Sequence, residues 1–122
     1  MTASINWFEI PVNNMQRAVK FYGALLDQPL TQKDGPDGPM YVFGGEQGGI
    51  GALLESDAQS EFLPSTAGTL IYLGTDDIDA ALKRAETAGG KLLQARTSIG
   101  PFGFIGRFLD TEGNAVALHT GG

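Results

Sequence analysis

The chain has 122 residues, 8 basic and 14 acidic side chains, a formal net charge of −6, no cysteine and 18 glycines. This length predicts one domain over residues 1–122. The lack of cysteine excludes disulfides, thiolate metal sites and a cysteine nucleophile. The acidic balance argues against nucleic-acid binding, which needs clustered lysine and arginine. Because no apolar run is long enough for a membrane span and the first residues lack a signal-peptide pattern, we expect a soluble, cytoplasmic protein without membrane contact.

The first half of the chain begins with a predicted strand at residues 5–12, where apolar side chains alternate with others. A helix follows it, with Asn13 or Asn14 as the N-cap, because apolar residues then recur at helical spacing. Two short apolar runs, residues 40–45 and 50–55, predict strands. The glycine-, proline- and aspartate-rich segment at residues 33–39 predicts a turn. Residues 56–68 are polar, contain one proline and show no clear period, so they predict a connection.

The second half repeats this pattern. Residues 68–75 predict a strand, and Asp76 or Asp77 predicts the N-cap of a second helix that ends at Gly89-Gly90. Three further strands are expected at residues 91–96, 103–110 and 114–120, with residues 111–114 as a hairpin turn between the last two.

The two halves align at a constant offset of 63 residues, at which Asn14 matches Asp77 and Lys20 matches Lys83. The strand before each helix and the strand after it keep the same offset, which indicates an internal duplication. Each unit then contains strand, helix, strand, strand and strand, and the fold class is α+β. The first unit covers about residues 4–56 and the second about residues 67–120.

This duplicated pattern resembles the vicinal oxygen chelate superfamily, which includes glyoxalase I, bleomycin-resistance proteins and extradiol dioxygenases. The segments that carry the resemblance are residues 12–22, 76–81 and 110–114, and the opening Trp7-Phe8-Glu9-Ile10-Pro11-Val12 and the closing Leu118-His119 look like a subgroup described as glyoxalase-related. The resemblance implies two βαβββ units whose curved mixed sheets surround a cleft, with the helices outside. It also implies a homodimer, because the sheets of this family commonly complete their clefts through subunit pairing.

Strand geometry then predicts which residues face the cleft. Successive side chains of a strand point to opposite faces, so the apolar residues expected under the helices leave their neighbours on the cleft side. The cleft-facing residues are Trp7, Glu9, Leu70, Tyr72, Ala115, Ala117 and His119.

A metal cofactor is not expected. The resemblance implies that metal-using relatives place His, Gln or Glu at cleft positions that are occupied here by Trp7, Leu70 and Ala117. Indole, isobutyl and methyl groups offer no lone pair to a divalent cation. One alternative stays open, a displaced metal site formed by Glu9 and His119, which Glu55 would join if the register of its strand permits.

Three cleft residues are candidates for chemistry. Glu9 is a carboxylate on an otherwise apolar strand and would suit a general base or acid, or it is held structurally by a hydrogen bond from Tyr72, His119 or a backbone amide. His119 would shuttle a proton or orient a ligand, or it is a surface histidine. Tyr72 would donate a hydrogen bond to a ligand oxygen, or it serves packing.

Other residues would line the cleft. Trp7 would form a flat wall for a planar ligand or fill space in the core, while Leu70 and Ala117 would complete the lining. Phe102 and Phe104 lie in a segment rich in glycine and proline that would cap the cleft mouth or form a dimer contact. Arg96 and Arg107 would meet an anionic ligand or remain solvated.

The leading hypothesis is a metal-independent protein that binds a small hydrophobic or aromatic metabolite. The second hypothesis is a lyase or isomerase, in which Glu9 abstracts a proton next to a carbonyl and Tyr72 or His119 stabilises the enolate. The third is an enzyme with the displaced metal site at Glu9 and His119.

Overall fold

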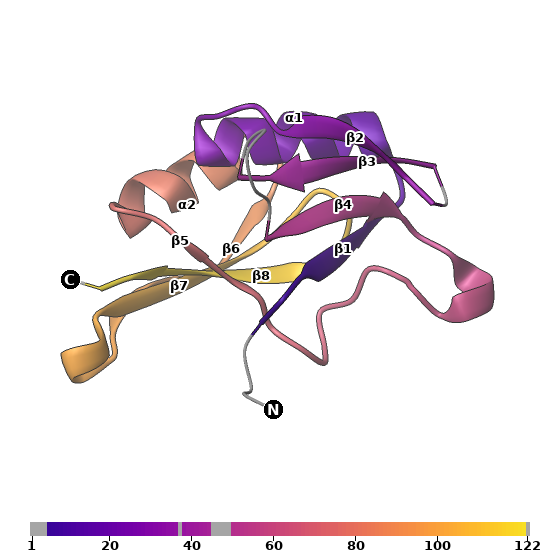
Figure 1. Cartoon of the computed structure of the whole chain (residues 1–122). Coiled ribbons are helices and arrows are strands. Elements are labelled where there is room, and N and C mark those ends of the chain that lie inside the picture. The colour runs from indigo at the N-terminus through magenta and orange to yellow at the C-terminus, as the bar shows by residue number, and fades with distance from the viewer. Residues whose placement is uncertain (1–4, 37, 45–49, 122) are drawn as a thin grey trace.

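The computed structural model describes residues 5–36, 38–44 and 50–121. Within these residues the chain forms two four-stranded mixed sheets and two α-helices (Figure 1). The first unit contains, in chain order, β1 (Phe8–Val12), α1 (Met15–Leu26), β2 (Thr31–Gly35), β3 (Gly38–Phe43) and β4 (Gly51–Glu55). The second contains β5 (Tyr72–Gly74), α2 (Ile78–Thr87), β6 (Lys91–Ser98), β7 (Phe104–Leu109) and β8 (Ala115–Thr120).

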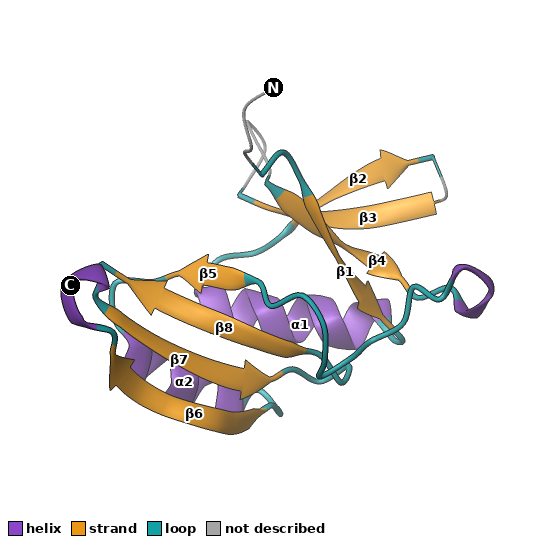
Figure 2. Cartoon of the chain, turned by 90° about the horizontal axis from the view of Figure 1, so that it is seen from below, coloured by secondary structure: helices purple, strands orange, loops and turns teal. Residues whose placement is uncertain are grey.

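Both sheets have the same topology, which confirms the predicted α+β fold of two βαβββ units. The strand orders are β1-β4-β3-β2 and β5-β8-β7-β6. In each sheet the first strand of the unit is parallel to the last one, and the remaining neighbours are antiparallel. Figure 2 shows the ribbon of α2 behind β6 and β7, so this helix covers one face of the second sheet.

Several predicted boundaries were wrong. The turn expected at residues 33–39 is confined to the tip of the β2–β3 hairpin, where Gly35 pairs with Gly38. Lys33 and Asp34 are strand residues because β2 is an edge strand, and exposed edge positions accept the polar residues that are also typical of turns. The predicted strand at 68–75 shortens to β5, and the end of the predicted strand at 40–45 lies outside the described residues.

The helix caps follow the sequence pattern. The Asn14 side chain accepts a hydrogen bond from the backbone N–H of Arg17, and the Asp77 side chain accepts one from the backbone N–H of Ala80. The structure thus selects Asn14 over Asn13 and Asp77 over Asp76, and it places the caps at equivalent positions of the two repeats.

One hydrophobic core joins the two units. It contains the residues predicted to lie under the helices, among them Ile10, Val12, Leu73, Val116 and Leu118. Aromatic rings from both units meet in it: the centroids of Phe21 and Tyr22 on α1 lie 5.0 Å apart, and Phe21 lies 5.8 Å from Phe108 on β7. The helix of the first unit therefore packs against the sheet of the second. In the described part of the chain no helix is long and apolar enough to cross a membrane.

Candidate functional site

The second sheet carries a row of four side chains on the face opposite the core. Its members are register partners on β5, β8, β7 and β6: Tyr72, Ala117, Arg107 and Gln94. Because Val116 and Leu118 belong to the core, Ala117 between them points to the other face, and its register partners point the same way. We call this set the Tyr72 row.

The Tyr72 row combines an aromatic ring, a small floor and a polar end. The Tyr72 side chain is 49% exposed, whereas Ala117 is fully buried and contributes only a methyl group. At the other end, Arg107 Nε donates a hydrogen bond of 3.0 Å to Gln94 Oε1. This bond orients the guanidinium of Arg107. The remaining N–H groups of the guanidinium would donate hydrogen bonds to a ligand oxygen.

The loop containing Phe102 is attached to the end of this face. His119 lies two residues after Ala117 on β8, and its Nε2 lies 2.7 Å from the carbonyl oxygen of Phe102, to which it donates a hydrogen bond. Gly103 has a φ of +104°, and a Cβ there would collide with the carbonyl of Thr120. The loop is therefore held close against β8 while the Phe102 ring remains 73% exposed.

Phe104 does not lie on the same face as the Tyr72 row. Phe104 pairs with Thr120 and lies three positions before Arg107 on β7, so the two side chains point to opposite faces of the sheet. The Phe104 ring is on the helix side and packs against the core. The guanidinium of Arg96 covers its ring at 4.9 Å. Leu70 is half-buried and precedes β5. The Tyr72 row therefore does not include Phe104, which the sequence grouped with Phe102.

The first sheet places Trp7 and Glu9 together. The Trp7 indole Nε1 donates a hydrogen bond of 3.2 Å to Glu9 Oε2, so Glu9 receives its bond from Trp7, a partner that the sequence did not suggest. Glu9 lines two small cavities, one of about 210 Å³ that it shares with Ile71 and Ala115 of the second unit, and one of about 150 Å³ that it shares with residues of β3 and β4. It thus lies where the two units meet.

The three candidate catalytic residues make separate contacts. Glu9 accepts a hydrogen bond from Trp7, and His119 donates one to the carbonyl of Phe102. Among the described residues no hydrogen bond joins Glu9 to Tyr72 or to His119. A role of these side chains in one reaction stays a prediction.

The side chains at the cleft do not fit a metal ion. The positions at which the family resemblance places ligands hold Trp7, Leu70 and Ala117, whose side chains have no lone pair for a cation. Glu55 lines the smaller cavity together with Glu9, although the register partners of the two residues, Val12 and Ala52, belong to alternate faces of the sheet. In the described part of the chain no three His, Asp or Glu side chains lie close enough to share a metal.

A buried polar network at the turn between β7 and β8 was not foreseen from the sequence. Asp110 is 3% exposed and accepts hydrogen bonds from the hydroxyl of Tyr22 at 2.6 Å, the backbone N–H groups of Glu112 and Asn114, and the Asn114 amide. Burial raises the pKa of Tyr22 well above its ordinary value, and the negative charge of Asp110 and its hydrogen bond with Tyr22 raise it further.

Glu112 in the same turn holds the start of the first helix. Its carboxylate accepts bonds from the backbone N–H groups of Asn13 and Asn14 and from Arg17, with Nε–Oε2 and Nη2–Oε1 distances of 2.7 and 3.0 Å. Burial alone would raise the pKa of Glu112, but the bonds from Arg17, Asn14, Thr111 and Asn13 lower it below its ordinary value. The sequence showed a polar hairpin here; its partners, almost a hundred residues away, are visible only in the fold.

Comparisons with known proteins agree with this architecture. A family model described as the Glyoxalase/Bleomycin resistance protein/Dioxygenase superfamily matches residues 4–118. A glyoxylase-like domain-containing protein of Didymella fabae is 32% identical and covers 95% of this chain and 92% of its own. The anthracycline biosynthesis protein DnrV of Streptomyces peucetius is 25% identical over 92% of this chain, which spans only 45% of that relative.

Solved structures share the fold. The crystal structure of TnmS3, an antibiotic binding protein from a Streptomyces species, superposes with a TM-score of 0.67 at 22% identity, covering 99% of this chain and 98% of its own. At this identity the similarity concerns the backbone arrangement alone.

Proposed function

Because the chain belongs to the glyoxalase/bleomycin resistance protein/dioxygenase superfamily, we propose that it binds a small planar aromatic molecule without using a metal ion. The single observation that carries this proposal is the Tyr72 row. It presents a half-exposed tyrosine and, across the small residue Ala117, an oriented guanidinium at the far end.

The chemistry of the row supports a flat ligand with a polar edge. Aromatic rings stack on one another with a gain beyond the area that they bury, about 0.5–1.5 kcal/mol per pair. Ala117 between Tyr72 and Arg107 carries only a methyl group, and the Arg107 guanidinium offers N–H donors to the oxygens of a ligand. Trp7, which is 39% exposed on the first sheet, adds a second aromatic surface near the junction of the units.

Two of the compared proteins support the same class of ligand. One is named for anthracycline biosynthesis and the other for antibiotic binding, and both names concern small organic molecules. Metal independence rests on the donor set: the indole, isobutyl and methyl groups of Trp7, Leu70 and Ala117 do not coordinate cations.

We extend the proposal to a homodimer. Large apolar residues remain exposed along the edge strand β6 of the second sheet: Leu92 and Leu93, 44% exposed each, lie at its start, and Phe102, 73% exposed, lies in the loop after its end. An exposed edge strand that carries apolar residues favours association of two copies of the chain.

The alternative with Glu9 as a general base has one supporting observation, that Glu9 lines two cavities, of which the larger lies between the units. Proton abstraction next to a carbonyl also needs a donor for the developing oxyanion. His119 donates to the carbonyl of Phe102, and in the described residues neither His119 nor Tyr72 is hydrogen-bonded to Glu9, so we favour the binding role.

The test is a titration with alizarin, a planar three-ring molecule with oxygen substituents, followed by calorimetry and by quenching of Trp7, the single tryptophan. Tyr72→Ala should weaken binding about three- to tenfold, because ring stacking is lost. Tyr72→Phe, which keeps the ring, should bind like the unchanged protein. Leu63→Ala, which shortens an apolar side chain 47% exposed elsewhere, serves as the control.

Two further measurements distinguish metal-independent binding from the alternatives that use Glu9 or a metal ion. Glu9→Gln should leave the affinity unchanged, and EDTA should have no effect. An unchanged affinity in Tyr72→Ala would overturn the Tyr72 row as the binding site, and loss of binding in EDTA would overturn metal independence.

A further inference from the structure

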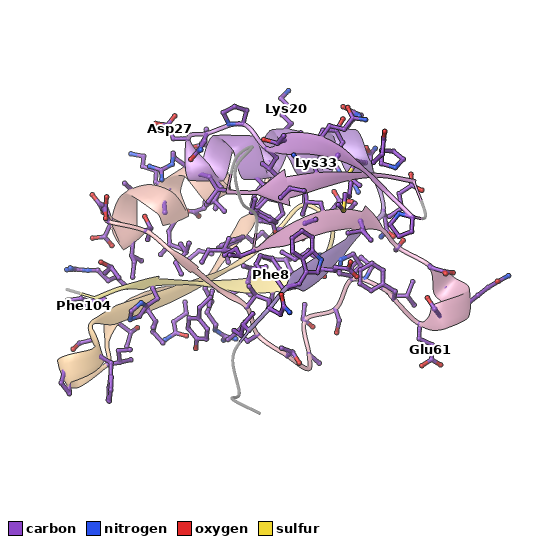
Figure 3. The ribbon with its side chains drawn as sticks, viewed as in Figure 1. Phe8, Lys20, Asp27, Lys33, Glu61 and Phe104 are labelled. Carbon is purple, nitrogen blue, oxygen red and sulfur yellow. The ribbon has the colours of Figure 1, made fainter. Side chains whose placement is uncertain are left out.

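A second concave site lies between the two helices, on the opposite side of the second sheet from the Tyr72 row. It is a groove of about 810 Å³ lined only by residues of α1, α2 and their C-terminal ends. Figure 3 shows Lys20 and Asp27, which border it, on the outer side of α1. Its volume lies within the range of roughly 300–1,000 Å³ that is usual for small-molecule sites.

The floor of the groove is apolar because both helices carry alanines there. Ala24 on α1 and Ala80 and Ala88 on and after α2 line it. The large apolar residues of both helices, such as Phe21 and Leu82, point instead into the core. Methyl groups facing each other across two packed helices leave a trough that an apolar body can fill.

The rim is basic although the chain as a whole has a net charge of −6. Lys20, Lys83 and Arg84 line the groove, and Asp27 is the one acidic side chain among its lining residues. In the described part of the chain the ion pairs are Arg17–Glu112 and Arg96–Asp79, so the three basic groups have no carboxylate within 4.0 Å. An anion would therefore meet three cations and one carboxylate, and none of the three cations forms a close ion pair with a described side chain.

Two features of the fold hold the three basic side chains beside the alanines of the groove floor. Lys20 and Lys83 are equivalent positions of the repeat, so the duplication sets one lysine on each helix beside the same trough. Arg84 Nε donates a 2.8 Å hydrogen bond to the carbonyl oxygen of Leu25, near the end of α1. This bond crosses from α2 to α1 and holds the guanidinium at the groove before any ligand arrives.

We propose that this groove binds a small amphipathic anion. Its apolar body lies on Ala24, Ala80 and Ala88, and its carboxylate, sulfonate or phosphate faces Lys20, Lys83 and Arg84. The site is separate from the Tyr72 row and does not depend on the function proposed above.

The experiment compares two fluorescent probes that differ in charge, 1-anilinonaphthalene-8-sulfonate and the uncharged N-phenyl-1-naphthylamine, at low ionic strength. The sulfonate should bind more tightly than the neutral probe. The double variant Lys20→Gln, Lys83→Gln should weaken sulfonate binding about three- to tenfold, as expected for two partly exposed ion pairs, and leave the neutral probe unchanged. Salt at about 0.5 M should reduce the affinity of the unchanged protein for the sulfonate.

Matched variants locate the binding. The double variant Lys33→Gln, Lys91→Gln removes the two lysines outside the groove and should bind both probes normally. Ala24→Phe places a ring on the floor at an exposed helix position and should weaken both probes, with the helical circular dichroism unchanged.

Three results would overturn the proposal. The first is equal sulfonate binding by the Lys20, Lys83 variant and the unchanged protein. The second is loss of sulfonate binding in Tyr72→Ala, which would move the site to the Tyr72 row. The third is a change of oligomeric state in the Lys20, Lys83 variant on size-exclusion chromatography, which would make the groove an interface between copies of the chain.

Discussion

The two units share a topology but differ at the turn before their last strand. In the second unit this turn is Asp110-Thr111-Glu112-Gly113-Asn114, whose acidic and amide side chains are buried. The equivalent residues of the first unit by the repeat offset, 47–51, are Gln-Gly-Gly-Ile-Gly, of which 47–49 lie outside the described residues. Only the second unit carries carboxylates at these positions.

The second turn binds the first unit, and this makes the duplication asymmetric. Asp110 accepts from Tyr22 and Glu112 accepts from Arg17, both on α1, and the Asn114 amide donates to the carbonyl of Pro11 on β1. Duplicated hydrophobic patterns produced two similar sheets, whereas one diverged turn supplies a set of buried polar contacts that join them.

The largest effect should come from Asp110→Ala, which leaves the Tyr22 hydroxyl and the Asn114 donors buried without their acceptor. We expect a loss of about 3–5 kcal/mol in the free energy of unfolding, measured by urea denaturation. Asp34→Ala on the exposed edge strand β2 is the control and should cost less than about 0.5 kcal/mol. Tyr22→Phe removes a single bond and should cost about 1 kcal/mol. If it costs nothing, the network does not stabilise the fold.

A smaller effect is expected from Glu112→Gln, which keeps a hydrogen-bond acceptor and removes the charge facing Arg17. The loss should be about 1–2 kcal/mol at neutral pH. The pKa of Glu112 is lowered in the folded state, so its contribution is complete above the unfolded-state pKa and is lost as the pH falls through the folded-state pKa. When the pH is lowered, the urea midpoint should therefore fall less in Glu112→Gln than in the unchanged protein. Glu86→Gln, on the exposed face of α2, should decline like the unchanged protein.

The smallest effects are expected from removal of the side-chain caps of the two helices. Asp77→Ala removes the side-chain cap of α2 and should cost about 1 kcal/mol. Asn14→Ala should cost about half of that, because Glu112 still accepts from the backbone N–H groups of Asn13 and Asn14 at the start of α1. Equal losses in urea denaturation would show that Glu112 does not share the capping of α1.

The sequence predicted the features that depend on neighbouring residues. Hydrophobic periodicity located both helices, and short polar side chains at Asn14 and Asp77 marked their starts, because a cap bonds to an amide three residues away. Strand alternation also placed Ile10, Val12, Val116 and Leu118 in the core. The turn at residues 33–39 was predicted too long, because an exposed edge strand and a turn have similar composition.

The candidate site was predictable only in part. Alternation indicated that Tyr72 and Ala117 share a face, since this needs only strand parity and the pairing of the two strands. The Arg107–Gln94 bond, the bond from Trp7 to Glu9 and the separation of Phe104 from Phe102 depend on register and on loop geometry, which composition does not encode locally.

The sequence by itself determined an acidic, cysteine-free chain of two repeated βαβββ units. These properties follow from residue identity, periodicity and spacing, all of which are local, while the positions of Trp7, Leu70 and Ala117 at the usual metal-ligand sites are what the family resemblance implies. Tertiary structure alone decided that Glu112 and Asp110 hold the first helix and that Lys20 and Lys83 border one groove. Such contacts join residues dozens of positions apart, and their partners are selected by how the shared core packs the two units together.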